Sequence, residues 1–73
     1  MSLQEIHAFV NALWKELIKP TWEKSEQDWE EVVRLSGKIG DDHGNTDLVV
    51  KMINAYLTAL EEREKSNGEV RQL

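Results

Sequence analysis

The sequence predicts an all-α protein: a small three-helix bundle that associates as a helical dimer. Apolar residues recur at spacings of three and four in three separate segments, as amphipathic helices require, and no segment shows the alternation of a strand. A chain of 73 residues allows one small domain with a marginal core. Cysteine is absent, so no disulfide can staple such a scaffold, and a partner subunit is one remaining source of stability. We place a single helical domain at residues 1–68 and a flexible tail at residues 69–73.

The first helix is expected over residues 2–18. Ser2 and Glu5 have the spacing of a capping box, in which each side chain bonds the backbone N–H of the other residue. Pro20 is expected to end the helix at about Ile18, because a residue that precedes proline avoids the α region. The apolar positions of this helix follow the helical period: Leu3, Ile6, Phe9, Val10, Leu13, Trp14, Leu17 and Ile18.

The second helix is expected to reach residue 39 and to stop at Gly40, a typical residue after a helix end. Its start is open between residue 21 and residue 25. Pro20 suits a first helical turn, which favours the earlier start. Ser25 resembles an N-cap with acidic residues behind it, which favours the later one. Gly37 inside this helix indicates either fraying or a close approach by a neighbouring element.

The third helix is expected over residues 46–66. Asn45 or Thr46 is its N-cap, and Asp47 favours the first turn. The stretch Ser66–Gly68 is expected to close it. Its apolar residues are numerous and broadly spread around the helix: Leu48, Val49, Val50, Met52, Ile53, Ala55, Tyr56, Leu57 and Leu60.

The stretch GDDHGNTD, residues 40–47, is the part of the sequence that most resembles a chemical site. A calcium loop of the EF-hand type needs a glutamate at its twelfth position, and counting from Asp41 that position holds Met52. Zinc needs three or four ligands, which this chain could assemble only if the first helix brought His7 beside His43 and a neighbouring aspartate. A phosphate at the start of the third helix would be repelled by the aspartates of the same stretch.

A plain turn between two helices explains the same eight residues. Gly40 and Gly44 supply the turn geometry, the aspartates stay solvated, and the cap comes from Asn45 or Thr46. We therefore expect residues 40–47 to be a linker, with no bound metal and no cofactor.

Composition argues against several classes of function. The net charge is −5, and the basic residues are scattered, so we expect no nucleic-acid binding through phosphate contacts. Neither histidine has a serine or aspartate partner at a catalytic spacing, so we expect no enzyme. No apolar run is long enough for a membrane span and no signal-peptide pattern is present, which favours a cytoplasmic protein. The acidic residues from Glu23 to Glu31 form either a solvated helix face or a surface that docks on a basic partner.

The run DWEEVVRLSGKIG, a short polar turn and the run LVVKMINAYLTALEER together resemble small acidic helical proteins of phages and prophages of Gram-positive bacteria. The resemblance covers about residues 20–65. It implies an accessory interaction protein and transfers no functional residue.

The width of the apolar faces predicts self-association. At 100° per residue the apolar arc of the first helix covers about 180° and that of the third helix about 220°, whereas a surface helix needs little more than 100°. Two short neighbours cannot easily cover such arcs, so we expect a non-enzymatic interaction module that forms a homodimer, with another protein partner as a further option. The alternative is a small transcriptional or nucleic-acid-associated regulator that acts through a protein partner. The expected dimer interface consists of Phe9, Leu13, Trp14, Val50, Ile53 and Leu57.

Overall fold

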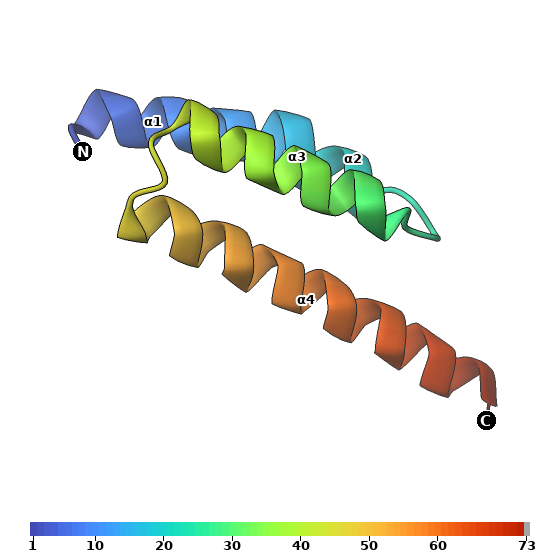
Figure 1. Cartoon of the computed structure of the whole chain (residues 1–73). Helices are drawn as coiled ribbons and strands as arrows, with labels where there is room; N and C mark the ends of the chain where they lie inside the picture. The colour runs from blue at the N-terminus through green and yellow to red at the C-terminus, as the bar shows by residue number, and fades with distance from the viewer. Residues whose placement is uncertain (73) are drawn as a thin grey trace.

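The structure, a computed structural model, describes the backbone of residues 1–72 and the side chains of residues 1–66. In this part of the chain there is no strand, and three helices are connected by two short segments, as Figure 1 shows. The all-α, three-helix prediction is confirmed. The first helix, called the N-terminal helix below, runs without a break through α1, η1 and α2; the elements are α1 (Leu3–Ala12), η1 (Leu13–Ile18), α2 (Lys19–Trp22), α3 (Trp29–Asp42) and α4 (Asp47–Gln72).

The predicted capping box opens the N-terminal helix. The Ser2 hydroxyl accepts a hydrogen bond from the Glu5 backbone N–H, and the Glu5 carboxylate accepts one from the Ser2 backbone N–H, both at 3.1 Å. Two of the N–H groups that a helix leaves unpaired at its start are thereby satisfied.

Pro20 does not end the N-terminal helix, contrary to the sequence prediction. A proline inside an α-helix lacks the N–H donor, and its ring collides with the carbonyl four residues earlier. Over Leu13–Ile18 the chain adopts the wider π-helical turn instead, with the Lys19 N–H donating to the carbonyl of Trp14. The proline therefore enters a widened turn, and the helix continues to Trp22.

The bounds of α3 also differ from both starts considered for the second helix. Its N-cap is Asp28, whose carboxylate accepts a hydrogen bond from the Glu31 N–H at 3.4 Å. The helix passes through the expected stop at Gly40 and ends at Asp42. A single glycine costs only about 1 kcal/mol inside a helix, which is too little to terminate one that is packed along its length.

The turn between α3 and α4 uses left-handed backbone at two residues. Gly44 has φ +81° and Asn45 has φ +49°. Glycine and asparagine adopt this region most readily, so these residues stop α3. Of the two predicted caps of the third helix, Thr46 has the role: its hydroxyl accepts a 3.4 Å hydrogen bond from the Val49 N–H.

The backbone of α4 is helical through Gln72, past the expected stop at residues 66–68. Gly68 alone is again too small a penalty to end a helix. The expected loose tail, residues 69–73, lies outside the residues whose side chains the structure describes.

The core is a strip of apolar side chains shared by all three helices. The half-buried Leu35, Met52 and Tyr56 pack against it. The buried apolar side chains are Phe9, Leu13, Leu17, Val32, Ile39, Val49, Ile53 and Leu60. The molecule is long and thin, 47 × 17 × 16 Å, so much of its surface lies close to this core. No helix in the described range is both long and apolar enough to cross a membrane.

Candidate interaction surface

The six residues predicted for an interface fall into two groups in the structure. Three of them are part of the core of the single chain: Phe9, Leu13 and Ile53 are 0%, 3% and 6% exposed. Trp14 and Val50 are exposed, at 53% and 40%, and Leu57 is half-buried. Phe9 and Leu13 have no surface to offer a partner without a change of fold, whereas Ile53 reaches the surface in the groove described next, with Val50 and Leu57.

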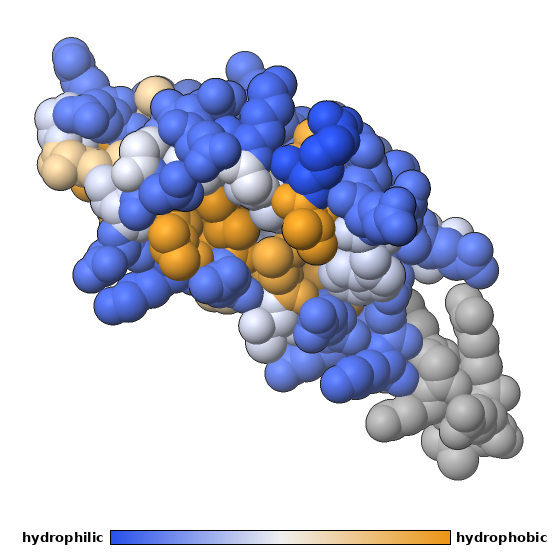
Figure 2. All heavy atoms as spheres, in the orientation of Figure 1, coloured by the Kyte–Doolittle hydropathy of each residue, from blue (hydrophilic) through white to orange (hydrophobic). Residues whose placement is uncertain are grey.

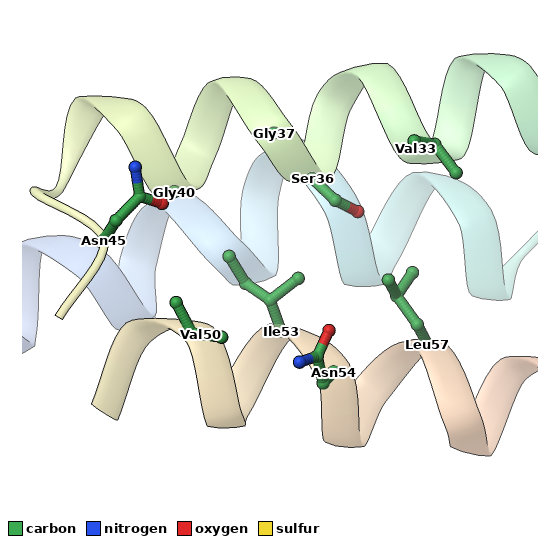
Figure 3. Close-up of a pocket in the computed structure, with 9 residues that line it drawn as sticks. All are labelled: Val33, Ser36, Gly37, Gly40, Asn45, Val50, Ile53, Asn54 and Leu57. Carbon is green, nitrogen blue, oxygen red and sulfur yellow. The ribbon is translucent and has the colours of Figure 1, made fainter. Parts of the chain in front are cut away.

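An apolar groove runs between α3 and α4, and its volume is about 250 Å³. Figure 2 shows hydrophobic residues gathered between these two helices on the face in view, with hydrophilic residues around them. Figure 3 shows the side chains that line the groove. They are Val33, Ser36, Gly37, Gly40, Asn45, Val50, Ile53, Asn54 and Leu57.

The α3 wall of this groove combines one projecting side chain with a site that has none. Val33 is 62% exposed. One turn later, a Cβ atom built on Gly37 would meet nothing within 4 Å. Between them, the Ser36 hydroxyl donates to the Val32 carbonyl at 2.8 Å, so its polar atom is satisfied inside the helix. The wall therefore offers an apolar projection beside an open notch.

Gly40 has a different role from Gly37. A Cβ atom on Gly40 would lie 2.6 Å from Oδ1 of Asn45, so a side chain there would force the asparagine to turn away. The Asn45 N–H donates to the Gly40 carbonyl at 2.9 Å, and its side-chain amide donates to the Asp41 carboxylate at 2.8 Å. Gly40 thus lets the turn fold back tightly against the end of α3.

The opposite side of α4 is closed by polar bonds to the N-terminal helix. The hydroxyls of Thr21 and Tyr56 lie 2.5 Å apart, and Thr21 also donates to the Leu17 carbonyl. The Arg63 guanidinium donates to the carbonyls of Trp22 and Lys24, at 2.6 and 2.8 Å. It also lies 4.2 Å from the centre of the Trp22 ring, a cation–π contact. We call this contact, made by Thr21, Trp22, Tyr56 and Arg63, the polar seam.

Two tryptophans on the N-terminal helix stay exposed. Trp14 and Trp22 are 53% and 46% exposed, and with Ile18 they border a slot of about 150 Å³. Its other two lining residues, Lys19 and Glu23, form an exposed ion pair at 4.0 Å. The third tryptophan, Trp29, is half-buried and donates its ring N–H to the Glu64 carboxylate at 3.1 Å, which joins α3 to α4.

The turn at residues 40–47 does not gather a ligand set. The His43 ring packs on Phe9, with ring centres 5.4 Å apart, whereas His7 is exposed on α1. The described residues contain no group of three or more histidine, aspartate or glutamate side chains that could hold a metal ion. The absence of a bound metal stays a prediction.

The acidic stretch from Glu23 to Glu31 divides into separate local roles. Asp28 caps α3, and Glu31 bonds Arg34 through two contacts, at 3.0 and 2.5 Å. The Arg34 guanidinium lowers the pKa of the Glu31 carboxyl below its ordinary value. The remaining acids of the stretch are exposed. A docking role for the stretch remains a prediction.

The described surface thus includes the α3–α4 groove and the tryptophan slot as apolar features, and Leu3, Val10 and Leu48 are further exposed apolar side chains. For Gly37 the sequence left two interpretations open, fraying or a close approach by a neighbour, and the structure shows neither: α3 continues to Asp42, and a Cβ atom on Gly37 would meet nothing within 4 Å. The chain matches no family model, and comparisons with curated proteins and with solved structures found no match.

Proposed function

We propose that this protein is a non-enzymatic protein–protein interaction module that acts as a homodimer. The observation that carries the proposal is the α3–α4 groove, where apolar side chains remain at the surface although the chain has already formed a core. Val33 at 62% and Val50 at 40% exposure lie on opposite walls of one continuous depression. Contiguous apolar surface of this kind marks interaction sites on monomers that are otherwise polar.

The size of the accessible surface supports association with a protein of similar size. The chain exposes 5305 Å², whereas a monomer of its 8.5 kDa mass is expected to expose about 4,650 Å². The excess, about 650 Å², follows from the elongated shape of the molecule, 47 × 17 × 16 Å, which leaves more surface for a partner to cover than a compact chain would.

Sedimentation equilibrium at tens of micromolar tests the proposal. The expected result is a species of twice the 8.5 kDa chain mass that dissociates on dilution. A single species at the chain mass throughout would refute the homodimer. The resemblance to small acidic phage and prophage proteins is compatible with such a module, but the proposal does not depend on it.

A further inference from the structure

The α3–α4 groove has no charge in its lining. None of its nine lining residues is ionisable, although 32% of the residues of the chain are charged. The fully buried centre of an interface is depleted of charge for a physical reason: an unpaired charge taken out of water costs several kcal/mol. A groove of this kind can face an identical groove without burying a single like-charged pair.

The walls of the groove also complement each other in shape. Figure 3 shows Val33 opposite Leu57 at one end, Gly37 opposite Ile53 in the middle, and Gly40 opposite Val50 at the other end. One end is therefore narrowed by two branched side chains. In the middle the α3 wall is open, because a Cβ atom on Gly37 would meet nothing within 4 Å, whereas at the other end the Asn45 side chain lies against Gly40.

We infer that a second copy of this chain occupies the groove, with a twofold axis that runs along it. This inference rests on the homodimer proposed above and names its contact surface. In the pair, α3 of each copy lies across α4 of the other. Val33 then meets Leu57 of the second copy, and the notch at Gly37 faces Ile53 and Asn54 of the second copy. Both contacts occur twice, as a twofold axis requires.

The charges beside the groove give this arrangement a definite electrostatic pattern. α3 and α4 are antiparallel and joined by the turn, and a twofold axis along the groove places both turns at the same end. Asp41 then comes near Lys51 of the second copy, which is attractive. At the far end Glu30 comes near Glu61 of the second copy, which is repulsive. All four side chains are exposed in the single chain.

The first test fills the notch without disturbing the chain. Gly37→Gln adds a side chain where a Cβ meets no neighbour, and glutamine is the better helix former, so the variant should fold with at least the helix content of the parent. Its side chain would occupy the space meant for the second copy. We expect self-association to weaken at least tenfold, measured by sedimentation equilibrium, with circular dichroism as the check of folding.

Ala55→Gln is the matched control. Ala55 is exposed on α4 and does not line the groove, so the same added side chain should leave the dimer unchanged. If the parent dimerises and Gly37→Gln dimerises equally well, the groove is not the contact, while the homodimer itself stands. If the parent is a monomer at tens of micromolar, the groove contact and the proposed function both fail.

Charge reversal tests the direction of the axis. Lys51→Glu removes the attraction to Asp41 and should weaken association, whereas Glu30→Lys replaces the repulsion from Glu61 and should strengthen it. Both changes should reach a few-fold in the dissociation constant at low salt and shrink at 1 M salt, where screening is nearly complete. Shifts in the same direction for both variants would contradict the axis along the groove.

Discussion

The two sides of α4 are built in different ways. Toward the N-terminal helix, α4 makes the polar seam, in which Tyr56 and Arg63 bond the backbone and side chains near the end of α2. Toward α3 the one side-chain hydrogen bond of the described residues that joins the two helices is that of Trp29 with Glu64, and the rest of that side is the open groove.

The difference shows how a small chain can divide its surface between stability and association. Bonds to the carbonyls of Trp22 and Lys24 give the polar seam its geometry and satisfy backbone that a connecting segment would otherwise leave to water. The groove has no such hydrogen bonds, and its side chains, with Gly37 among the lining residues, are too small to fill it. We expect changes at the seam and the core to alter the free energy of unfolding, and changes at the groove to alter self-association.

The largest effect should come from Leu60, which is fully buried in the core that supports both sides of α4. Leu60→Ala removes buried methyl groups and leaves a cavity, which should lower the free energy of unfolding by about 2–5 kcal/mol. Thr58→Ala, an exposed change on the same helix, should leave it nearly unaltered. Urea titrations of both variants at one protein concentration would measure the contrast. Equal losses would mean that α4 is not packed as described.

Opening the polar seam should have the next largest effect. Arg63→Met keeps a long side chain over Trp22 but deletes both hydrogen bonds to backbone carbonyls and the cation–π contact, so the expected loss is about 2 kcal/mol. Arg34→Met provides the comparison, because Arg34 makes only an exposed ion pair with Glu31, and its loss should change the free energy of unfolding much less. Equal melting temperatures for the two variants would show that the polar seam does not stabilise the fold more than an exposed ion pair does.

The turn at the end of the groove should contribute about as much to the free energy of unfolding as one helix cap does. Thr46→Ala removes the hydroxyl that accepts from Val49 and should cost about 1 kcal/mol. Asn45→Gly keeps the left-handed backbone and should cost less, because glycine adopts positive φ without strain. Thermal melts of the two variants decide between Thr46 and Asn45 as the residue that matters; a larger loss for Asn45→Gly would reverse the assignment.

A smaller effect should appear as a pH dependence at the start of the N-terminal helix, far from the groove. The Ser2 backbone N–H, followed by the Ser2 hydroxyl, lowers the pKa of the Glu5 carboxyl below its ordinary value of 4.5. A lowered folded-state pKa stabilises the fold above the unfolded pKa, and this contribution is lost as the pH falls through the folded pKa. Parent and Glu5→Gln should therefore melt differently near neutral pH and converge in acid. A gap that widens below pH 4.5 would be inconsistent with this sign.

No effect is expected from divalent metals on the turn. Millimolar Ca²⁺, Mg²⁺ or Zn²⁺ should leave the melting temperature unchanged, since residues 40–47 bring no ligand set together. Binding at a hundred times the dissociation constant would add about 2.7 kcal/mol, which a melt of so small a domain would register as several degrees. An upward shift with one of the metals would show that the turn is a site.

Local patterns of the sequence were enough to predict the class of fold and some of its details. The capping box of Ser2 and Glu5, and Thr46 as one of the two candidate caps of α4, depend on residues three or four apart, so their effect is present in any chain with that spacing. The same holds for the number of helices, which follows from the period of the apolar residues.

Helix ends were predicted less well because tertiary contacts override weak local signals. Pro20 lies inside the N-terminal helix because a π-helical turn precedes it, and Thr21 is held there by Tyr56 from a helix 35 residues away. Gly40 does not stop α3, which continues to Asp42. The glycine is needed instead because a side chain at this position would collide with the Asn45 side chain. The Thr21–Tyr56 contact joins residues 35 apart in the chain, so no pattern within a few residues contains it.

The surface was the feature that only the tertiary structure decided. The sequence by itself determined that α4 has an apolar arc wider than one neighbour can cover, and along that arc Ile53 and Val50 were equally good candidates for an interface. Packing then placed Ile53 in the core and left Val50 at the surface, beside a glycine and a valine of α3. Amphipathic period fixes which residues share a face, whereas the positions of the neighbouring helices, set by contacts between residues far apart in the chain, decide which part of that face stays exposed.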